Sequence, residues 1–233
     1  MNDMSQSLLA FVDVHAGFAG HQILRGVSFR IEPGVSTALV GLNGAGKSTL
    51  LRLALDLIAP SSGSITLKGK PANHPSARQH LAYLPERFNS PHFLTGGELL
   101  ASLLRLHGIP YSRHAAAEEC ERLGLSSAVL DQRARLYSKG MHQALGLVAC
   151  LLTRREFLVL DEPMSGLDPL TFERFCARLR EAQTTGVTLF FSSHAPSMLD
   201  QLCGRVILLQ EGEIAFDGTP AALSGLYPRR ALG

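Results

Sequence analysis

The segment Gly41-Leu42-Asn43-Gly44-Ala45-Gly46-Lys47-Ser48 matches the phosphate-loop pattern, in which a glycine and four further residues precede Gly-Lys-Ser. An apolar run over 37–40 predicts a buried strand before it, and the residues after it predict a helix over 47–58. Glycines let the backbone wrap closely around a ligand, and a helix N-terminus adds positive charge. The sequence therefore predicts a phosphate-binding loop. A chance glycine-rich turn is the alternative, but it does not account for lysine and serine both in register.

Two side chains of this loop and an acidic pair further along predict the chemistry. Lys47 would place a positive charge at the β- and γ-phosphates, and Ser48 would offer its hydroxyl to Mg²⁺. The apolar run 157–160 ends in Asp161 and Glu162, and open α/β sheets bind ligands at the C-terminal ends of such strands. Asp161 would hold Mg²⁺ through water, and Glu162 would orient or deprotonate the attacking water. The acidic pair alone is a weak indication, and it becomes strong beside the phosphate loop.

The rest of the chain alternates between strand and helix patterns. Apolar or alternating runs predict strands over 8–15, 27–31, 65–67, 187–192, 206–210 and 213–216. From Phe88 to Thr153 the pattern is helical, with a capping box at Thr95 and further helices over 112–123 and 141–152. Asp168-Pro169 predicts the start of another helix that ends near Gly186. This order predicts a parallel α/β core with a helical lobe inserted in its middle.

The bulk properties exclude several classes of protein. The 233 residues suffice for one substantial core, and the 45% hydrophobic and 18% charged residues are typical of a globular chain. A formal net charge of +2 without a clustered basic run argues against a partner made of nucleic acid. No apolar stretch approaches the ~20 residues that cross a bilayer, and we expect no signal peptide at the polar start. The four dispersed cysteines are expected to be reduced thiols of a cytosolic protein.

Three further segments narrow the prediction beyond a nucleotide triphosphatase. Tyr137-Ser138-Lys139-Gly140-Met141 lies before a predicted helix, Ser165-Gly166-Leu167-Asp168 follows the acidic pair, and His194 ends a later strand. In this order and spacing the sequence resembles the ATP-binding subunits of ABC transporters over nearly the whole chain. The resemblance implies an α/β, P-loop NTPase (RecA-like) core with a parallel sheet, an N-terminal antiparallel β subdomain and an inserted helical subdomain. It implies one domain over 1–233, with the core at 1–84 and 154–233 and the helical signature subdomain at 85–153.

The resemblance also implies roles at the second half of the site. Ser138 and Gly140 match the family's signature loop, whose common form is Leu-Ser-Gly-Gly-Gln, and Ser138 would donate to the γ-phosphate of ATP held by the opposite subunit. Lys139 and Met141 depart from that form and look like the variant of a group of exporters with separate ATPase and membrane chains. Asp168 resembles the aspartate that links the two subunits, although it also fits a plain helix cap.

Three other residues take roles from the same resemblance. His194 resembles the switch histidine at the γ-phosphate and joins Glu162 and Lys47 as a catalytic residue. Phe18 stands where the family places an aromatic ring that stacks on adenine, with a place in the core as the alternative. Thr49 completes the nucleotide contacts expected of the phosphate loop.

Glu86 departs from the family pattern. The family usually has glutamine after the strand that begins the helical subdomain, where it senses Mg²⁺ and couples to the membrane partner, and this chain has Glu86. A carboxylate can ligate Mg²⁺ and accept hydrogen bonds, but it cannot donate as an amide does. We interpret Glu86 as a mark of the exporter subgroup. The alternative is an ordinary exposed glutamate after a proline.

The implied cofactors are ATP and Mg²⁺, and the implied partners are other subunits. A second copy of the chain or a paralogous ATPase subunit would pair head to tail with it, and a transmembrane permease subunit would dock between Phe88 and Pro110. The chain would lie at the cytoplasmic face of a membrane as a peripheral subunit. Soluble ABC ATPases of translation or DNA repair usually carry two such domains or long coiled coils, and this sequence has no heptads. A binding module without catalysis would have lost part of the machinery that is present here.

Overall fold

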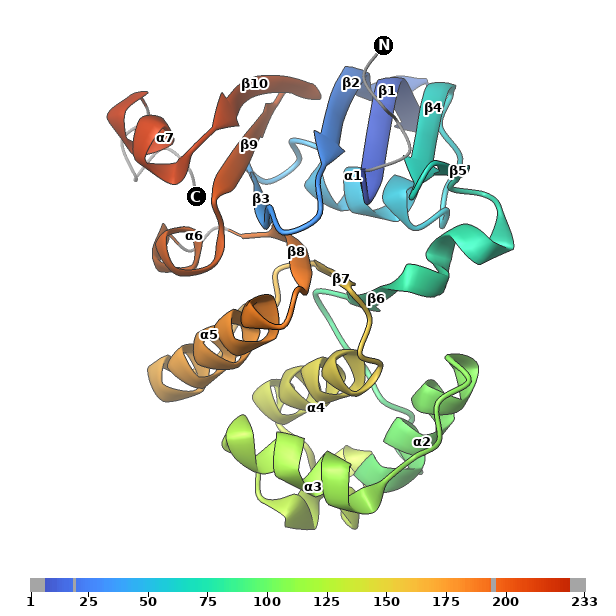
Figure 1. Cartoon of the computed structure of the whole chain (residues 1–233), viewed down its shortest axis with the longest axis vertical. Coiled ribbons are helices and arrows are strands. Elements are labelled where there is room, and N and C mark those ends of the chain that lie inside the picture. Colours follow the sequence, from blue (N-terminus) through green and yellow to red (C-terminus); the bar gives the residue numbers. More distant parts are fainter. Residues whose placement is uncertain (1–6, 19, 194–195, 227–233) are drawn as a thin grey trace.

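The structure is a computed structural model that describes residues 7–18, 20–193 and 196–226. It contains two β-sheets and a group of helices arranged in layers (Figure 1). The first sheet has the order β2-β1-β4-β5 and only antiparallel pairings among the described residues. Its strands are β1 (Leu9–Phe18), β2 (His21–Ile31), β4 (Ser62–Leu67) and β5 (Lys70–Pro71).

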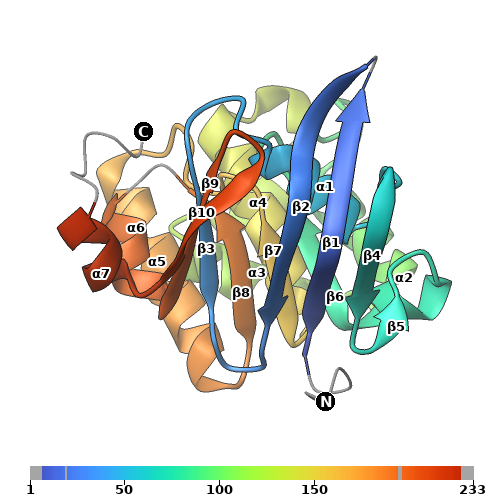
Figure 2. The ribbon, with the colours of Figure 1, turned by 90° about the horizontal axis from the view of Figure 1, so that it is seen from above.

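The second sheet has the order β10-β9-β3-β8-β7-β6 and lies beside the first (Figure 2). Neighbouring strands from β9 to β6 pair in parallel, and β10 adds an antiparallel edge. The strands are β3 (Thr37–Val40), β6 (Leu81–Leu84), β7 (Phe157–Leu160), β8 (Thr188–Ser192), β9 (Arg205–Gln210) and β10 (Glu213–Gly218). The predicted parallel core and N-terminal antiparallel sheet are thereby confirmed.

Successive residues of the parallel strands face two separate cores. On β7, Phe157 and Val159 pack in the core that includes the first sheet and α1 (Lys47–Ala54). Leu158 and Leu160 pack in the core on the other face, which the remaining helices cover. Burial on both faces explains why these strands are continuous apolar runs in the sequence.

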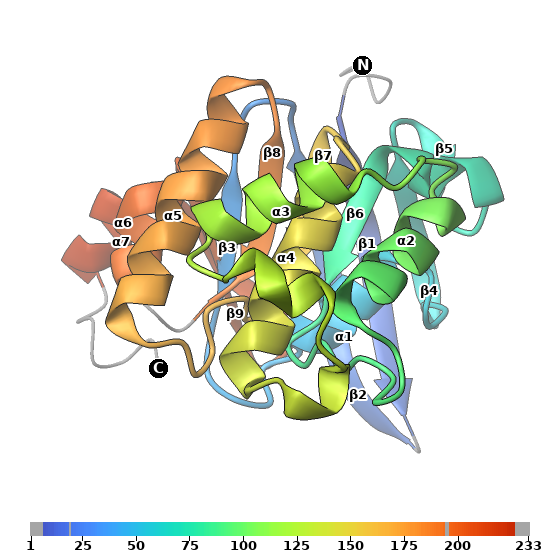
Figure 3. The same ribbon diagram turned by 90° about the horizontal axis from the view of Figure 1, so that it is seen from below.

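The helices on the second core lie over the parallel strands (Figure 3). They are α2 (Gly96–Leu106), α3 (Arg113–Arg122), α4 (Lys139–Leu152), α5 (Pro169–Thr184), α6 (Pro196–Leu202) and α7 (Pro220–Leu226). Three short 3-10 helices cover Pro75–His80, Ser127–Leu130 and Ala134–Leu136. None of the helices in the described part of the chain has the length and apolar character needed to span a membrane.

Two predicted helix starts are confirmed by their capping hydrogen bonds. At α2, the Glu98 N–H donates to the Thr95 hydroxyl at 3.2 Å, and the Thr95 N–H donates to the Glu98 carboxylate at 2.8 Å. At α5, the Asp168 carboxylate accepts from two backbone N–H groups, those of Leu170 and Thr171, at 3.1 Å each. Asp168 therefore acts as the N-cap of α5, which was one of the two roles predicted for it.

Some boundaries were predicted wrongly. The helix expected over 47–58 ends at Ala54, because Asp56 adopts a left-handed φ of 56° and its carboxylate bonds Arg78 at 2.8 Å. The strand expected from Val27 begins at His21, since the antiparallel ladder continues to the Phe18–His21 pair. The cysteines are free thiols, as expected, with Cys203 the least buried of them.

Candidate active site

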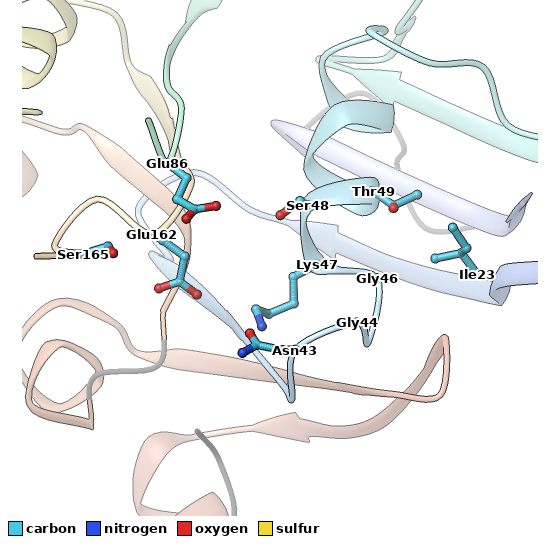
Figure 4. A pocket seen from close by; sticks show the side chains of 10 residues that line it. All are labelled: Ile23, Asn43, Gly44, Gly46, Lys47, Ser48, Thr49, Glu86, Glu162 and Ser165. Carbon is cyan, nitrogen blue, oxygen red and sulfur yellow. The ribbon is translucent and has the colours of Figure 1, made fainter. Parts of the chain in front are cut away.

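A pocket of about 470 Å³ opens at the C-terminal edge of the parallel strands. The phosphate loop and the start of α1 form one wall, and the segments after β6 and β7 form the other (Figure 4). The side chain of Ile23, from β2, completes the lining. The lining residues are Ile23, Asn43, Gly44, Gly46, Lys47, Ser48, Thr49, Glu86, Glu162 and Ser165.

Glycines hold the phosphate loop close to its neighbours. Gly41 has a φ of 148°, and a Cβ there would lie 2.2 Å from the carbonyl oxygen of Leu209 on β9. Gly46 has a φ of 106°, and a Cβ there would lie 2.8 Å from the Leu24 side chain on β2. Only glycine fits both the backbone conformation and the space. Gly41, Leu42 and Ala45 belong to the loop without lining the pocket.

Lys47 is the buried cation of this pocket, with 7% of its surface exposed. Its Nζ donates to the Gly41 carbonyl at 2.7 Å and lies 3.4 Å from the Leu42 carbonyl. Burial lowers the pKa of Lys47 from its ordinary value, and the carboxylates of Glu162, Asp161 and Glu86 oppose that shift. A positive charge that backbone carbonyl groups hold inside the pocket is suited to phosphate oxygens.

The acidic pair is joined by a hydroxyl that the sequence did not single out. The Ser192 Oγ donates to the Asp161 carboxylate at 2.6 Å and accepts from the Glu162 N–H at 2.8 Å. Ser192 is fully buried at the end of β8, which neighbours β7 at the same edge of the sheet. A polar residue at the end of a predicted buried strand is the pattern that could have identified it.

The two acids occupy different environments. Asp161 is 5% exposed and does not line the pocket, whereas Glu162 and Glu86 line it. Figure 4 shows the carboxylates of Glu162 and Glu86 on the side of the pocket that faces Ser48 and Lys47. Glu162 has a φ of 43°, a left-handed conformation that is disfavoured for a residue with a side chain and occurs often at functional sites.

The hydroxyl and carboxylate groups at this pocket are suited to the Mg²⁺ ion that the resemblance implies. Mg²⁺ prefers oxygen ligands and keeps several waters or substrate phosphates beside one or two carboxylates. Ser48 lines the pocket with a hydroxyl and Glu86 with a carboxylate, and the Asp161 carboxylate is close enough to Lys47 to affect its pKa. Among the described residues there is no group of three or more His, Cys, Asp or Glu side chains that could hold a metal ion.

The predicted signature residues lie outside this pocket. Ser138 is the exposed N-cap of α4 and accepts from the Met141 N–H at 3.2 Å. Gly140 follows it, and the Lys139 Nζ lies 3.4 Å from the Ser165 hydroxyl, so this segment lies beside the loop after Glu162. Asp168, at the far end of that loop, is also exposed and does not line the pocket.

The pocket leaves the predicted roles of two further residues untested. Phe18 ends β1 with half of its surface exposed, and Ile23 of the neighbouring strand lines the pocket in its place. His194 lies outside the residues that the structure describes. The roles of Phe18 and His194 therefore stay predictions.

Comparisons with known proteins identify the family. The family model described as ABC transporter matches residues 24–165. An uncharacterized ABC transporter ATP-binding protein of Nostoc sp. is 38% identical over 87% of this chain and 61% of its own length, so the chain spans about three fifths of that relative. The Nod factor export ATP-binding protein I of Burkholderia pseudomallei is 33% identical over 94% of this chain and 73% of its own length.

A solved structure supports the same assignment over the whole fold. The ATP-binding subunit of an ABC transporter superimposes with a TM-score of 0.81 at 27% identity, over 97% of this chain and 96% of that one. The chain belongs to the ABC transporter family, and the relatives and the solved structure that it resembles are named as ATP-binding proteins or subunits of such transporters.

Proposed function

We propose that this chain binds and hydrolyses ATP between two subunits and thereby powers export through a separate membrane subunit. The observation that carries the proposal is the placement of Ser138 and Asp168. Both are exposed beside a loop that lines the nucleotide pocket, and neither lines that pocket itself. A second subunit, a copy of this chain or a paralogue, would bring such residues to the ATP.

In the proposed site the phosphate loop holds the nucleotide. The backbone N–H groups of the residues Gly41 to Ser48 would surround the phosphates, with Lys47 at the β- and γ-phosphates and Thr49 beside them. Phe18 would stack on the adenine ring. Ser138 and Gly140 of the partner subunit's equivalent loop would close the site from the opposite side.

Hydrolysis is proposed to depend on the acidic pair. Glu162 would orient or deprotonate the attacking water, and His194 would contact the γ-phosphate. Ser48, Asp161 and Glu86 would hold Mg²⁺, which neutralises developing charge on the phosphates when bound. The Ser192 hydroxyl would keep the Asp161 carboxylate and the Glu162 backbone in register, since it bonds both.

We propose one ATPase domain with a core at 1–84 and 154–233 and a helical subdomain at 85–153. A permease subunit would dock on the helical part between Phe88 and Pro110, where Phe93 and Leu106 are exposed by 69% and 83%. The chain would then lie at the cytoplasmic face of the membrane. The variant signature residues Lys139 and Met141 and the export named for the Burkholderia relative favour export over import.

Purification from native membranes tests this proposal. An affinity-tagged chain should recover one membrane subunit in fixed ratio, and deletion of that subunit should release the chain from the membrane fraction. In inside-out vesicles that carry the complex, ATP should drive uptake of the cargo into the vesicle. A chain that stays in the soluble fraction in every case would contradict the transporter role, and uptake only in right-side-out vesicles supplied with internal ATP would contradict export.

A further inference from the structure

A second pocket lies at the opposite edge of the parallel strands from the nucleotide pocket. It has a volume of about 380 Å³ and shares no lining residue with the first. The C-terminal ends of α4 and α5 and the segments that lead into β7 and β8 enclose it. Figure 3 shows α4 and α5 side by side over these strands. Its size falls within the range of small-molecule sites, about 300–1,000 Å³.

Arg155 lines this pocket with a guanidinium group that is only partly hydrogen-bonded. Its Nη2 donates to the His107 carbonyl at 3.1 Å, which fixes the guanidinium group. Its Nε is buried and has no hydrogen-bond partner among the described residues. Because Nε is closed off from the surface, a ligand can meet only the remaining part of the Arg155 side chain, which lines the pocket. The His107 carbonyl fixes the orientation of that guanidinium group toward an oxygen ligand.

The charges of Arg154 and Arg155 are not neutralised by the carboxylates around the pocket. Arg154 also lines the pocket, whereas Arg178 is committed to Glu119 through two contacts of 2.8 Å. The two acids of the lining have cations of their own, since Glu181 bonds Arg122 at 2.9 Å and Glu156 bonds Lys68 at 2.6 Å. Within the described part of the chain, neither Arg154 nor Arg155 forms an ion pair with a carboxylate.

The helix ends do not oppose an anion as strongly as bare carbonyl groups would. The Thr153 N–H donates to the Cys150 carbonyl at 3.2 Å, and the Arg154 N–H donates to the Leu151 carbonyl at 3.0 Å. These bonds occupy two carbonyl groups of the last turn of α4, those of Cys150 and Leu151. The floor of the pocket is apolar, with Leu158 and Ala182 buried.

We propose that this pocket binds a small organic carboxylate, with its acid group on Arg155 and Arg154 and its apolar part against Leu158, Ala182 and Val187. Guanidinium groups bind carboxylates through paired, charge-assisted hydrogen bonds, which makes this ligand class the best match. The site is a second binding site, separate from the nucleotide pocket.

Its position gives the ligand a regulatory effect, and this part rests on the proposed function. The pocket contacts the C-terminal ends of two helices whose N-termini carry Ser138 and Asp168. A ligand wedged between these ends changes how α4 and α5 sit relative to each other. The result is a change in how readily the two subunits close on ATP.

Benzoate is the probe for binding, because it joins a carboxylate to an apolar ring. Amide chemical shifts of the full chain are followed as benzoate is added into the millimolar range. Saturable shifts should appear at residues 150–158 and 182–187 and leave the phosphate loop unchanged. Acetate, which lacks the apolar body, should bind about tenfold more weakly or worse. Shifts confined to the phosphate loop, or none that saturate, would overturn the proposal.

Three variants assign the contact. Arg155→Met removes the donors at similar volume and should weaken benzoate binding at least about tenfold. The exposed Arg154→Ala should weaken it too, which decides the matter if Arg155→Met fails to fold. Arg180→Met, on helix α5 but outside the lining of the pocket, should bind as the wild type does. If all three variants bound benzoate with the affinity of the wild type, the assignment of the site would be overturned.

The ATPase rate tests the regulatory part separately. Saturating benzoate should change the rate of the wild type at least about twofold by altering site closure, and leave the Arg154→Ala rate unchanged. An unchanged wild-type rate overturns the regulation while the binding site stands. Absence of ATP hydrolysis with and without benzoate in the wild type would count against the proposed function and not against this pocket.

Discussion

Lys47 brings its positive charge into the nucleotide pocket from the first residue of α1. Its Nζ is held by the Gly41 carbonyl at 2.7 Å, so the charge is positioned before a ligand arrives. Lys47→Ala should weaken ATP binding about ten- to a hundredfold, the range expected for one charge-assisted hydrogen bond of about 1.5–3 kcal/mol. Titration with a fluorescent ATP analogue measures this. The exposed Lys70→Ala is the control, and an unchanged dissociation constant for Lys47→Ala would contradict the phosphate-loop role.

Glu162 is the residue proposed to act on water. Glu162→Gln keeps the size of the side chain and the strained backbone but removes the base. We expect ATP binding to be retained and turnover to fall roughly 10²–10⁴-fold. Phosphate release at saturating ATP is the measurement, with the exposed Glu213→Gln as the control. Turnover close to that of the wild type would exclude Glu162 as the catalytic base.

Single residues of the site differ in how far the sequence predicts them. Asn43, Lys47, Ser48 and Glu162 follow from local patterns, because each stands in a contiguous segment with defined chemistry. Ser192 does not, because its role arises only when β8 pairs beside β7 and brings its hydroxyl to the acidic pair. Long-range pairing of this kind is absent from any single stretch of sequence.

At the scale of elements, the phosphate loop is held against β9 by close backbone contact. A Cβ at Gly41 would lie 2.2 Å from the Leu209 carbonyl oxygen. Gly41→Ala should therefore displace the loop, lower the melting temperature by at least about 2–4 °C and weaken ATP binding. Thermal unfolding with and without ATP measures both effects. Gly204→Ala, with open space at its Cβ, should leave both unchanged, and equal behaviour of the two variants would refute the packing argument.

Glu86 connects the parallel sheet with the helices over 85–153. It follows β6, lines the nucleotide pocket, and its neighbour Pro85 accepts a hydrogen bond from Gln143 of α4 at 3.3 Å. If Glu86 relays the nucleotide state, Glu86→Ala should impair transport more than basal ATPase activity, because the phosphate loop and acidic pair assemble without it. Glu86→Gln should be much milder.

The complex reconstituted with its membrane subunit provides the test, with transport and hydrolysis measured side by side. An equal loss of both rates in Glu86→Ala would assign Glu86 to Mg²⁺ binding alone. No change in either rate would leave it an ordinary surface glutamate.

Elements also show where sequence patterns stop being informative. The Thr37–Val40 and Phe157–Leu160 strands match their predictions because both are short apolar runs bounded by polar residues. The predicted end of α1 was wrong. The Asp56–Arg78 contact turns the chain there, and local helix propensity does not reveal that contact. The short helix α7 packs only Leu223 fully into the core, which gives too weak a periodicity to predict it.

At the scale of the whole molecule, one chain carries two separate groups of residues to which the proposed function gives roles in ATP binding. Lys47 and Glu162 line the pocket. Ser138 and Asp168 are exposed on the surface and do not line it. In a head-to-tail pair, the pocket of each chain would meet Ser138 and Asp168 of the other chain, which would form two equivalent ATP sites. This explains why residues that the resemblance assigns to ATP do not line the pocket of their own chain.

The mass of the Glu162→Gln variant in solution tests this central claim most directly, because slow hydrolysis should preserve the ATP-bound pair. Light scattering with Mg²⁺ and ATP should give the mass of two 25.1 kDa chains, and the sample without ATP should give that of one. Adding Ser138→Arg to the variant should return it to a single chain with ATP still bound. A single-chain mass for Glu162→Gln in both conditions, at high protein concentration, would contradict the account.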